Sequence, residues 1–466
     1  MAHVQDLEIT CETVAKESSL ECGLAGAVAA VSGLKGSTII LHSPPGCGWT
    51  ARWARSDFAI NNYVPLVPDN LLQHNLIFGA SQKLYDSARW AMERWKPKQL
   101  FLMAGCAGSL IADPMNEIAT EMEKKYGSPV IVLDRAGFRG MVATGMDETF
   151  AEILGRLTAD GGGEKDPDSV NIVAPYLMGS SNWVYDLEEI RGLLEAIGLK
   201  VNCILTFNTT LEQLREFPRA SADIYLTWED FPQMREYEKR HDIVRLGQDL
   251  PLPIGAANTD QWYMSLARHF GKEAEAQRVM REQVASLRYL KFHYNATWVS
   301  TWIANKYAAV IGPAIWAASY ARFLYYDMAA YPSVIALYGE TQESIETAKE
   351  VLKDLTGYYD SLILENPLYI QVVKALNERN PEFVVGQTQD KSLVEGNGFP
   401  HITMSGLQTI LGGYNFMPYP SVGIKGILRQ FEALGHVVEK TFHEPRKWAA
   451  LAHHGREPRP EKGPLF

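Results

Sequence analysis

The sequence predicts an α/β protein built of three Rossmann-like, doubly wound domains with parallel sheets. A short apolar run, a turn rich in small residues and an amphipathic helix recur in that order along the chain. Apolar runs of this length are typical of parallel strands that are covered on both faces. At 466 residues the chain is also longer than one hydrophobic core normally serves, which indicates more than one domain.

The first domain is predicted to span residues 1–165. Its expected strands are residues 37–42, 99–103 and 129–133, and a glycine-containing turn follows each of them. A polar, glycine-rich segment at residues 161–169 then interrupts the pattern. Because glycine and proline clusters of this kind are typical of linkers, we place the first domain boundary there.

The same pattern returns twice more. The second domain, residues 166–300, has expected strands at 170–173, 201–205 and 224–227, a helix at 187–197 and a helical stretch from about 260 to 294. The third domain, residues 301–440, has expected strands at 307–312, 333–337, 383–385 and near 400–403. Residues 441–466 are expected to form a polar C-terminal extension.

Composition and charge exclude several functional classes. Hydrophobic residues make up 46% of the chain and charged residues 21%, as in ordinary globular proteins. The net charge of −11 argues against a nucleic-acid-binding groove, so no nucleic-acid partner is expected. No apolar run reaches membrane-spanning length, and the polar N-terminus lacks the features of a signal peptide, so we expect a cytoplasmic protein without a membrane partner.

Three cysteines in the first domain are the candidate metal ligands. Cys22, Cys47 and Cys106 each stand beside glycine, which lets backbone approach a bulky group and leaves the sulfur unobstructed. This setting favours thiolate ligation of an iron–sulfur cluster over the alternative, small buried side chains at strand ends. Because such a cluster usually takes four thiolates, a second polypeptide is expected to supply the remainder.

Other polar candidates carry weaker signals. Cys11 and Cys203 lack neighbouring glycines and are expected to be buried or unused thiols. His42 ends the strand before Cys47, so it is either a residue that orients the cluster loop or a buried histidine satisfied by its neighbours. No catalytic residue is assigned within this chain.

The cysteine-bearing segment resembles the amino-terminal part of nitrogenase component 1 subunits and their relatives. The matching residues, in order and spacing, are Cys22, His42, Cys47, Phe78, Gly79 and Cys106. Similar likeness continues through Thr209-Thr210 in the second domain and Gly398-Phe399-Pro400 in the third. The resemblance therefore covers nearly the whole chain and implies the three-domain fold of that family.

Within that family the chain resembles a β-type subunit. The α-type chains hold a substrate-reducing metallocofactor through a cysteine in the second domain and a histidine in the third. No cysteine follows Cys203, and the context of His401 resembles the β pattern. The resemblance implies that Cys22, Cys47 and Cys106 share a cluster with an α-like subunit, an [8Fe-7S] P-cluster being favoured and a [4Fe-4S] cluster being the alternative.

The resemblance also implies partners and a reaction. It predicts an α2β2 assembly in which an ATP-dependent [4Fe-4S] reductase docks at Phe78 and Gly79 and passes electrons through the cluster to the α-like subunit. This chain has no complete phosphate-binding loop, so ATP hydrolysis belongs to the reductase.

The substrate is the least determined part of the prediction. Ala112-Asp113-Pro114 stands in place of the Gly-Asp-Asp that is usual in nitrogenase-type chains, which favours a nitrogenase-like reductase, and among these a methylthio-alkane reductase that cleaves carbon–sulfur bonds. The alternatives are a dark-operative tetrapyrrole reductase, a cofactor-assembly scaffold and a true nitrogenase β-chain. For the tetrapyrrole alternative, an aromatic cluster is expected to line the substrate pocket: Trp49, Trp53, Phe58 and Tyr63.

Overall fold

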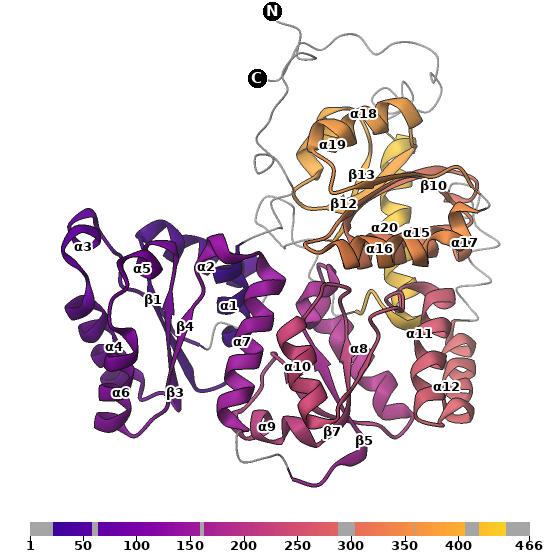
Figure 1. Ribbon diagram of the computed structural model, residues 1–466. Helices are drawn as coiled ribbons and strands as arrows, with labels where there is room; N and C mark the ends of the chain where they lie inside the picture. The colour runs from indigo at the N-terminus through magenta and orange to yellow at the C-terminus, as the bar shows by residue number, and fades with distance from the viewer. Residues whose placement is uncertain are drawn as a thin grey trace, which may run out of the picture.

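The computed structural model confirms the predicted fold class: three parallel sheets, each with helices on its faces (Figure 1). The structure describes residues 22–57, 64–158, 163–287, 303–357, 359–405 and 419–443. Cys11, Phe58 and Tyr63, and most of the predicted C-terminal extension, lie outside these residues. We refer to each sheet with its helices as a domain, and the exact domain limits stay a prediction.

The first sheet has the strand order β2-β1-β3-β4, and all its pairs are parallel. Its strands are β1 (Ser37–His42), β2 (Leu66–Pro68), β3 (Gln99–Ala104) and β4 (Val130–Asp134). Its helices are α1 (Gly23–Ser32), α2 (Pro45–Asp57), α3 (Gln73–Phe78), α4 (Ser81–Trp95), α5 (Cys106–Ile111), α6 (Met115–Tyr126) and α7 (Val142–Leu157).

Burial on both faces explains why the inner strands read as continuous apolar runs. In β1, Ile39 and Leu41 face the main core beneath α1 and α7, whereas Ile40 faces a second core beneath α4 and α6. All six residues of β1 and of β3 are buried. Successive side chains of a strand point to opposite faces, so a strand covered on both sides needs apolar residues at every position.

The second sheet has the order β6-β5-β7-β8, and a parallel arrangement again holds throughout. Its strands are β5 (Asp166–Val173), β6 (Lys200–Leu205), β7 (Ala220–Tyr225) and β8 (Val244–Leu246). Its helices are α8 (Trp183–Ala196), α9 (Leu211–Glu216), α10 (Pro232–His241), α11 (Gly255–His269) and α12 (Glu273–Ser286).

Three details of the second domain differ from the sequence prediction. The helix expected at 187–197 begins four residues earlier, at Trp183, and the strand expected at 224–227 ends at Tyr225, where its pairing with β5 ends. Up to residue 287 the predicted helical stretch is two helices, α11 and α12, and its predicted remainder, residues 288–294, lies outside the described residues. The two helices are separated at Gly271, whose φ of 65° belongs to the left-handed region and stops the helix.

The third sheet has five parallel strands in the order β11-β10-β9-β12-β13. The strands are β9 (Tyr307–Pro313), β10 (Tyr331–Tyr338), β11 (Leu362–Glu365), β12 (Phe383–Gln387) and β13 (His401–Ser405). Its helices are α15 (Ala314–Tyr326), α16 (Gln342–Val351), α17 (Lys353–Thr356), α18 (Tyr369–Arg379), α19 (Lys391–Gly396) and α20 (Gly423–His443). The last helix, α20, returns to pack against α11 and α12 of the second domain.

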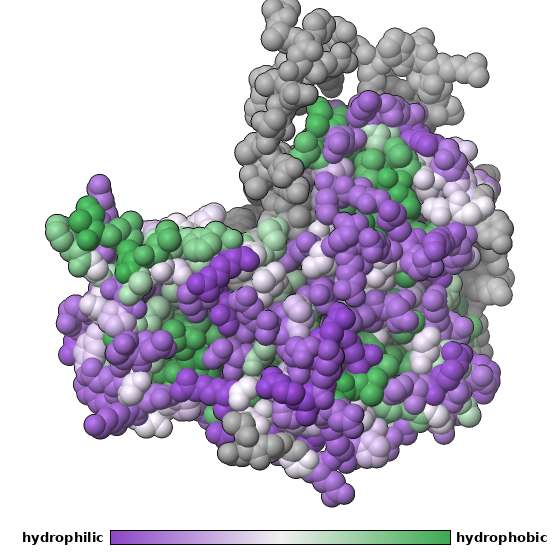
Figure 2. Space-filling model, in the orientation of Figure 1, coloured by the Kyte–Doolittle hydropathy of each residue, from purple (hydrophilic) through white to green (hydrophobic). Residues whose placement is uncertain are grey.

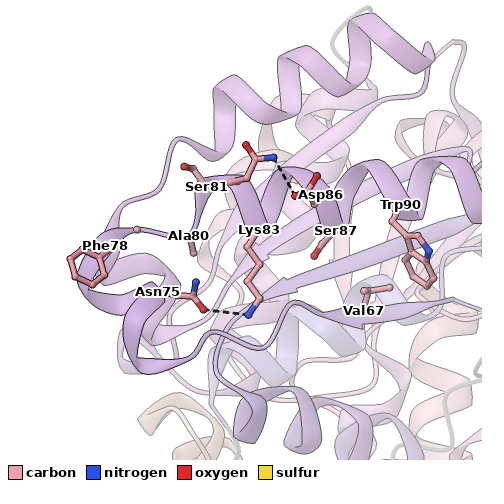
Figure 3. Close-up of a pocket in the computed structure, with 11 residues that line it drawn as sticks. Val67, Asn75, Phe78, Ala80, Ser81, Lys83, Asp86, Ser87 and Trp90 are labelled. Atoms are coloured by element: carbon pink, nitrogen blue, oxygen red, sulfur yellow. Dashed lines mark hydrogen bonds between the residues drawn. The ribbon is translucent and has the colours of Figure 1, made fainter.

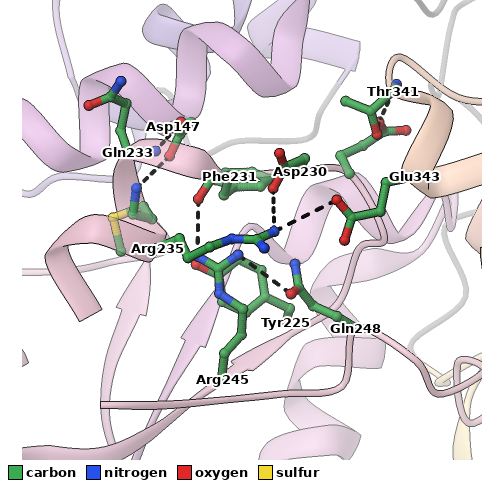
Figure 4. Close-up of polar contacts among 12 residues, drawn as sticks. Asp147, Tyr225, Asp230, Phe231, Gln233, Arg235, Arg245, Gln248, Thr341 and Glu343 are labelled. Atoms are coloured by element: carbon green, nitrogen blue, oxygen red, sulfur yellow. Dashed lines mark hydrogen bonds and ion pairs between the residues drawn. The ribbon is translucent and has the colours of Figure 1, made fainter. Parts of the chain in front are cut away.

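Buried and partly buried carboxylates join the three domains at helix ends. Asp147 of α7 accepts hydrogen bonds from the backbone N–H groups of Gln233 (2.9 Å) and Met234 (2.8 Å) at the start of α10 (Figure 4). Glu340, which follows β10, accepts one from the N–H of Ala143 (2.8 Å) at the start of α7. Carboxylates at helix N-termini satisfy otherwise unpaired donors and favourably face the positive end of the helix dipole. The first domain is thereby fixed to both others.

Across the parts of the chain that the structure describes, no helix is both long and apolar enough to cross a membrane.

Candidate cluster site

Two of the candidate cysteines follow the central strands of the first sheet. Cys47 lies in the first turn of α2, directly after β1, and Cys106 is the first residue of α5, directly after β3. The chain adds β2 on one side of β1 and then crosses to add β3 on the other, so the strand order reverses between β1 and β3. Ligands of open α/β sheets bind at this reversal, outside the carboxyl ends of the strands.

The third cysteine reaches the same edge through a close contact between two helices. Cys22 precedes α1, which crosses α7 at glycines: a Cβ added to Gly26 would lie 2.0 Å from the carbonyl oxygen of Val142, and one added to Gly145 would lie 1.9 Å from that of Gly23. No side chain fits at those distances. The two helices therefore pack backbone to backbone, and Cys22 lies beside the loop that leads into α7.

This loop, residues 135–141, brings two of the sulfurs together. A Cβ added to Gly137 would lie 3.1 Å from the Sγ of Cys22 and 3.2 Å from the Sγ of Cys106, so both sulfurs lie within about 3.2 Å of one point. The N–H of Gly137 also donates a hydrogen bond to the Sγ of Cys106 (3.1 Å). The loop is held in place by the N–H of Gly23, which donates to the carbonyl of Gly140 (2.8 Å).

The Cys47 thiol belongs to the same electrostatic environment. Burial raises its pKa, and the neighbouring Cys106 and Cys22 thiols raise it further. Cys47 and Cys106 are half-buried, whereas Cys22 is exposed. The structure therefore places all three sequence-predicted cysteines at one edge of the first sheet, with one side of the group open to the surface.

The residues present fit an iron–sulfur cluster. They supply thiol groups suited to iron ligation, a backbone N–H aimed at a sulfur, and a glycine where a larger residue would collide with two of the cysteine sulfurs. Among the described residues, no three His, Cys, Asp or Glu side chains converge closely enough to hold a single metal ion. The thiolates of a cluster bind different irons, so they need not converge on one point.

Exposed apolar side chains surround this edge. Trp49 is 64% exposed, Leu110 75% and Phe138 63%, and each lies within four residues of a cysteine or of Gly137. Figure 2 shows hydrophobic residues gathered along the side of the first domain that bears α3 and α5. Large apolar groups grouped on a surface are typical of a protein–protein interface.

Phe78 and Gly79, the predicted docking residues, stand at the end of α3. Phe78 is 85% exposed, and its neighbour Ile77 is 67% exposed. Gly79 has a φ of 87°, a conformation that glycine adopts without strain. An open groove of about 650 Å³ lies beside them, with Lys83 and Trp90 of α4 among its lining residues (Figure 3). Phe78 is therefore a surface residue and not part of the core.

His42 is buried and has charged partners that the sequence analysis missed. Its Nδ1 contacts a carboxylate oxygen of Asp69, and its Nε2 lies 3.0 Å from an oxygen of Asp113. Burial alone would lower the pKa of His42, but the two carboxylates outweigh burial and raise it. The sequence showed a carboxylate in the Ala112-Asp113-Pro114 segment. Gly137 follows a predicted strand and carried no other signal, and Asp69 follows β2, a strand that the sequence did not predict.

The remaining candidates lie elsewhere. Cys203 is buried in β6 of the second sheet, and burial raises the pKa of its thiol, as expected for an unused cysteine. His401 is buried at the start of β13 in the third sheet, where burial lowers its pKa to about 3. Of the predicted aromatic cluster, Trp49 and Trp53 lie in α2, and the described part of the chain does not include the other two.

Residues 22–444 match the family of nitrogenase component 1 type oxidoreductases, and the chain belongs to that family. It is therefore an oxidoreductase subunit of the nitrogenase-like class, and its family binds iron–sulfur clusters.

Among its relatives is a subunit of the light-independent protochlorophyllide reductase of Jannaschia sp. (strain CCS1), 24% identical over 383 residues that cover 82% of this chain and 69% of the relative. The nitrogenase molybdenum-iron protein alpha chain of Methanococcus maripaludis is 23% identical over 411 residues, 82% of this chain and 80% of the relative. The solved structure of Nitrogenase Cp1 at pH 5 superposes with a TM-score of 0.72 at 16% identity, covering 97% of this chain and 92% of that one.

Proposed function

We propose that this chain is the β-like, electron-relaying subunit of a nitrogenase-like reductase. In this proposal Cys22, Cys47 and Cys106 hold one half of an iron–sulfur cluster, and an α-like subunit holds the other half. The observation that carries the proposal is the grouping of the three thiols at one edge of the first sheet, which is open to the surface and rimmed by exposed apolar side chains.

Each element of the site has a definable task in that role. The bound cluster supplies one-electron chemistry with little rearrangement of its ligands. The Gly137 N–H donates to the Cys106 sulfur, and such hydrogen bonds tune a cluster's potential. Trp49, Leu110 and Phe138 supply apolar surface that would exclude water once the α-like subunit covers the edge. We favour the [8Fe-7S] type, with a [4Fe-4S] cluster as the alternative.

The docking of an ATP-dependent [4Fe-4S] reductase is assigned to Phe78 and Gly79. An aromatic side chain that is 85% exposed at the end of a short helix is a typical anchor for a partner protein. The assembly is proposed to be an α2β2 heterotetramer, in which the substrate is reduced on the α-like subunit.

The substrate class divides into two candidates. Reductive cleavage of methylthio-alkanes to methanethiol and a hydrocarbon stays the prediction of the sequence analysis. Tetrapyrrole reduction is the second candidate, because several of the relatives are subunits of light-independent protochlorophyllide reductases. Both candidates require the same relay in this chain. They differ in the substrate site, because the tetrapyrrole candidate also assigns Trp49 and Trp53 of α2 to the substrate pocket.

The test is anaerobic co-purification of this chain with its α-like partner, followed by mixing with the reductase and ATP. We expect the reductase to reduce the cluster. Methanethiol in the headspace would indicate a methylthio-alkane reductase, and the absorbance of a reduced tetrapyrrole would indicate a tetrapyrrole reductase. Ammonia from dinitrogen would indicate a true nitrogenase. A complex that reduces no substrate, yet transfers a metallocofactor to an empty enzyme, would show an assembly scaffold and overturn the relay.

A further inference from the structure

A buried group of three titratable side chains lies between the cluster site and the docking segment. His42, at the end of β1, is fully buried, as is the side chain of Asp69, and the side chain of Asp113 is 7% exposed. The imidazole contacts one carboxylate through each ring nitrogen. Buried charges are costly unless paired and hydrogen-bonded, so the three side chains are expected to keep one fixed arrangement.

One end of this group is tied to the docking segment. Both carboxylate oxygens of Asp113 accept from the backbone N–H of Ala80, at 3.0 and 3.2 Å. Ala80 follows Phe78 and Gly79, and a Cβ added to Gly79 would lie 3.5 Å from the same carboxylate. Asp113 is thus the residue that holds the turn between α3 and α4.

The other end is tied to both cluster-bearing segments. Asp69 accepts from the N–H of Ser43 (3.2 Å), four residues before Cys47. The carbonyl of His42 accepts from the N–H of Gly105 (3.1 Å), the residue before Cys106. A Cβ added to Gly108 would lie only 2.3 Å from that carbonyl, so α5 is pressed against the end of β1.

We infer that His42 is a positioning residue that couples the docking segment at Phe78–Gly79 to the cluster segments carrying Cys47 and Cys106. The coupling runs from the Ala80 N–H through Asp113 to the Nε2 of His42, and from His42 into both cluster segments. A contiguous network of hydrogen bonds is one of the physical routes by which two sites influence one another. The inference rests on the proposed electron relay and adds a route by which binding of the reductase reaches the cluster.

A matched pair of variants separates coupling from mere stability. In His42→Gln the side-chain amide nitrogen takes the place of Nε2 and keeps a donor toward Asp113. In His42→Asn it takes the place of Nδ1, keeps a donor toward Asp69 and loses the contact with Asp113. Both variants remove the same buried imidazole, so a structural role alone predicts similar effects for the two.

The experiment uses the co-purified complex with reductase and ATP. We expect both variants to keep the iron content and the electron paramagnetic resonance spectrum, and to be reduced by dithionite alone at the wild-type rate. Reductase-driven reduction of the cluster is expected to slow roughly fivefold or more in His42→Asn and to keep most of its rate in His42→Gln. Equal rates in the two variants, or loss of iron from both, would overturn the coupling.

A second pair of variants and a second measurement test the inference if the first experiment cannot be carried out. If the histidine variants do not fold, Asp113→Ala and Asp113→Asn replace them, because Asn keeps an acceptor for the Ala80 N–H and Ala does not. Equal rates in these two variants would again contradict the inference.

If the wild-type cluster is not reduced by the reductase, the proposed function fails. Hydrogen exchange at the Ala80 amide then tests the coupling without the reductase: we expect faster exchange in His42→Asn than in His42→Gln, and equal exchange would overturn it.

Discussion

The first and third sheets each have one reversal of strand order, and the residues at their carboxyl ends have different chemistry. In the first sheet the strand order reverses between β1 and β3, and in the third it reverses between β9 and β12. The first reversal is followed by Cys47 and Cys106, whereas β9 and β12 end at Pro313 and Gln387. The fold therefore provides an equivalent place in both domains, and only the residues that follow the strands make one of them a candidate cluster site.

The buried histidines of the two sheets show the same contrast. His42 lies between two carboxylates, and they raise its pKa despite burial. His401 has a hydroxyl, that of Thr403, 3.3 Å from its Nδ1, and burial together with Lys391 lowers its pKa to about 3. Burial disfavours the charged form of both rings, and neighbouring carboxylates reverse the outcome for His42.

The largest effect is expected from removing a cysteine at the first sheet. Cys106→Ala deletes a proposed iron ligand, so the iron content of the co-purified complex should fall to a small fraction of the wild-type value and the cluster's paramagnetic resonance should disappear. Cys203→Ala is the matched control, because that thiol is buried in the second sheet. An unchanged spectrum in Cys106→Ala would remove this cysteine from the ligand set.

Gly137→Ala tests the loop that brings the sulfurs together. The added Cβ would meet the Cβ of Cys22 at 3.0 Å and both sulfurs at about the same distance, so cluster assembly should be impaired, with iron content between those of Cys106→Ala and wild type. Gly155→Ala is the control, since nothing lies within 4 Å of its added Cβ and alanine favours a helix. Full iron content in Gly137→Ala would show that the loop does not pack against the bound cluster.

Phe78→Ala tests the docking surface. Loss of an exposed aromatic anchor should raise the KM for the reductase about tenfold. The iron content should not change, and the free energy of unfolding should change by less than about 0.5 kcal/mol because the side chain is exposed. Ile370→Ala, at an exposed position of α18 in the third domain, serves as the control. Equal KM values for the two variants would place docking elsewhere.

The smallest expected effects are opposite pH dependences of the two histidines. The raised pKa of His42 gives stability that is present below about 6.5 and lost as the pH rises through its folded pKa. The lowered pKa of His401 makes stability fall as the pH falls from about 6.5 toward about 3. The melting temperature should therefore depend less on pH on the alkaline side in His42→Gln and on the acidic side in His401→Gln. The same change in both variants would contradict this contrast.

The sequence predicted the interior of each sheet better than its edges. Strands such as β1 and β3 are buried on both faces, so their apolar runs mark them clearly. Of the edge strands, β2, β8 and β11 have three or four residues, none fully buried, and were not predicted, whereas β4, β6 and β13 are longer and were predicted. An edge strand is covered on fewer sides, and its sequence therefore carries a weaker signal.

The candidate cysteines of the site were predicted from their neighbours in sequence. Contacts between residues that are far apart in sequence were not predicted. Glycine neighbours indicated the three candidate cysteines, yet the close contacts that bring these cysteines together are made by Gly26, Gly137 and Gly145, none of which adjoins a cysteine in sequence. The partners of His42 lie 27 and 71 residues away. Such contacts are created by the order of the strands and the crossing of α1 with α7, which one sequence does not reveal.

The most direct test of the central claim is the iron content of this chain purified anaerobically alone and together with its α-like partner. If the three cysteines are one half of an interfacial site, the isolated chain should carry little iron, and the complex should carry about eight irons per pair of subunits for a P-type cluster or about four for a cubane. A full complement of iron on the isolated chain would contradict the claim.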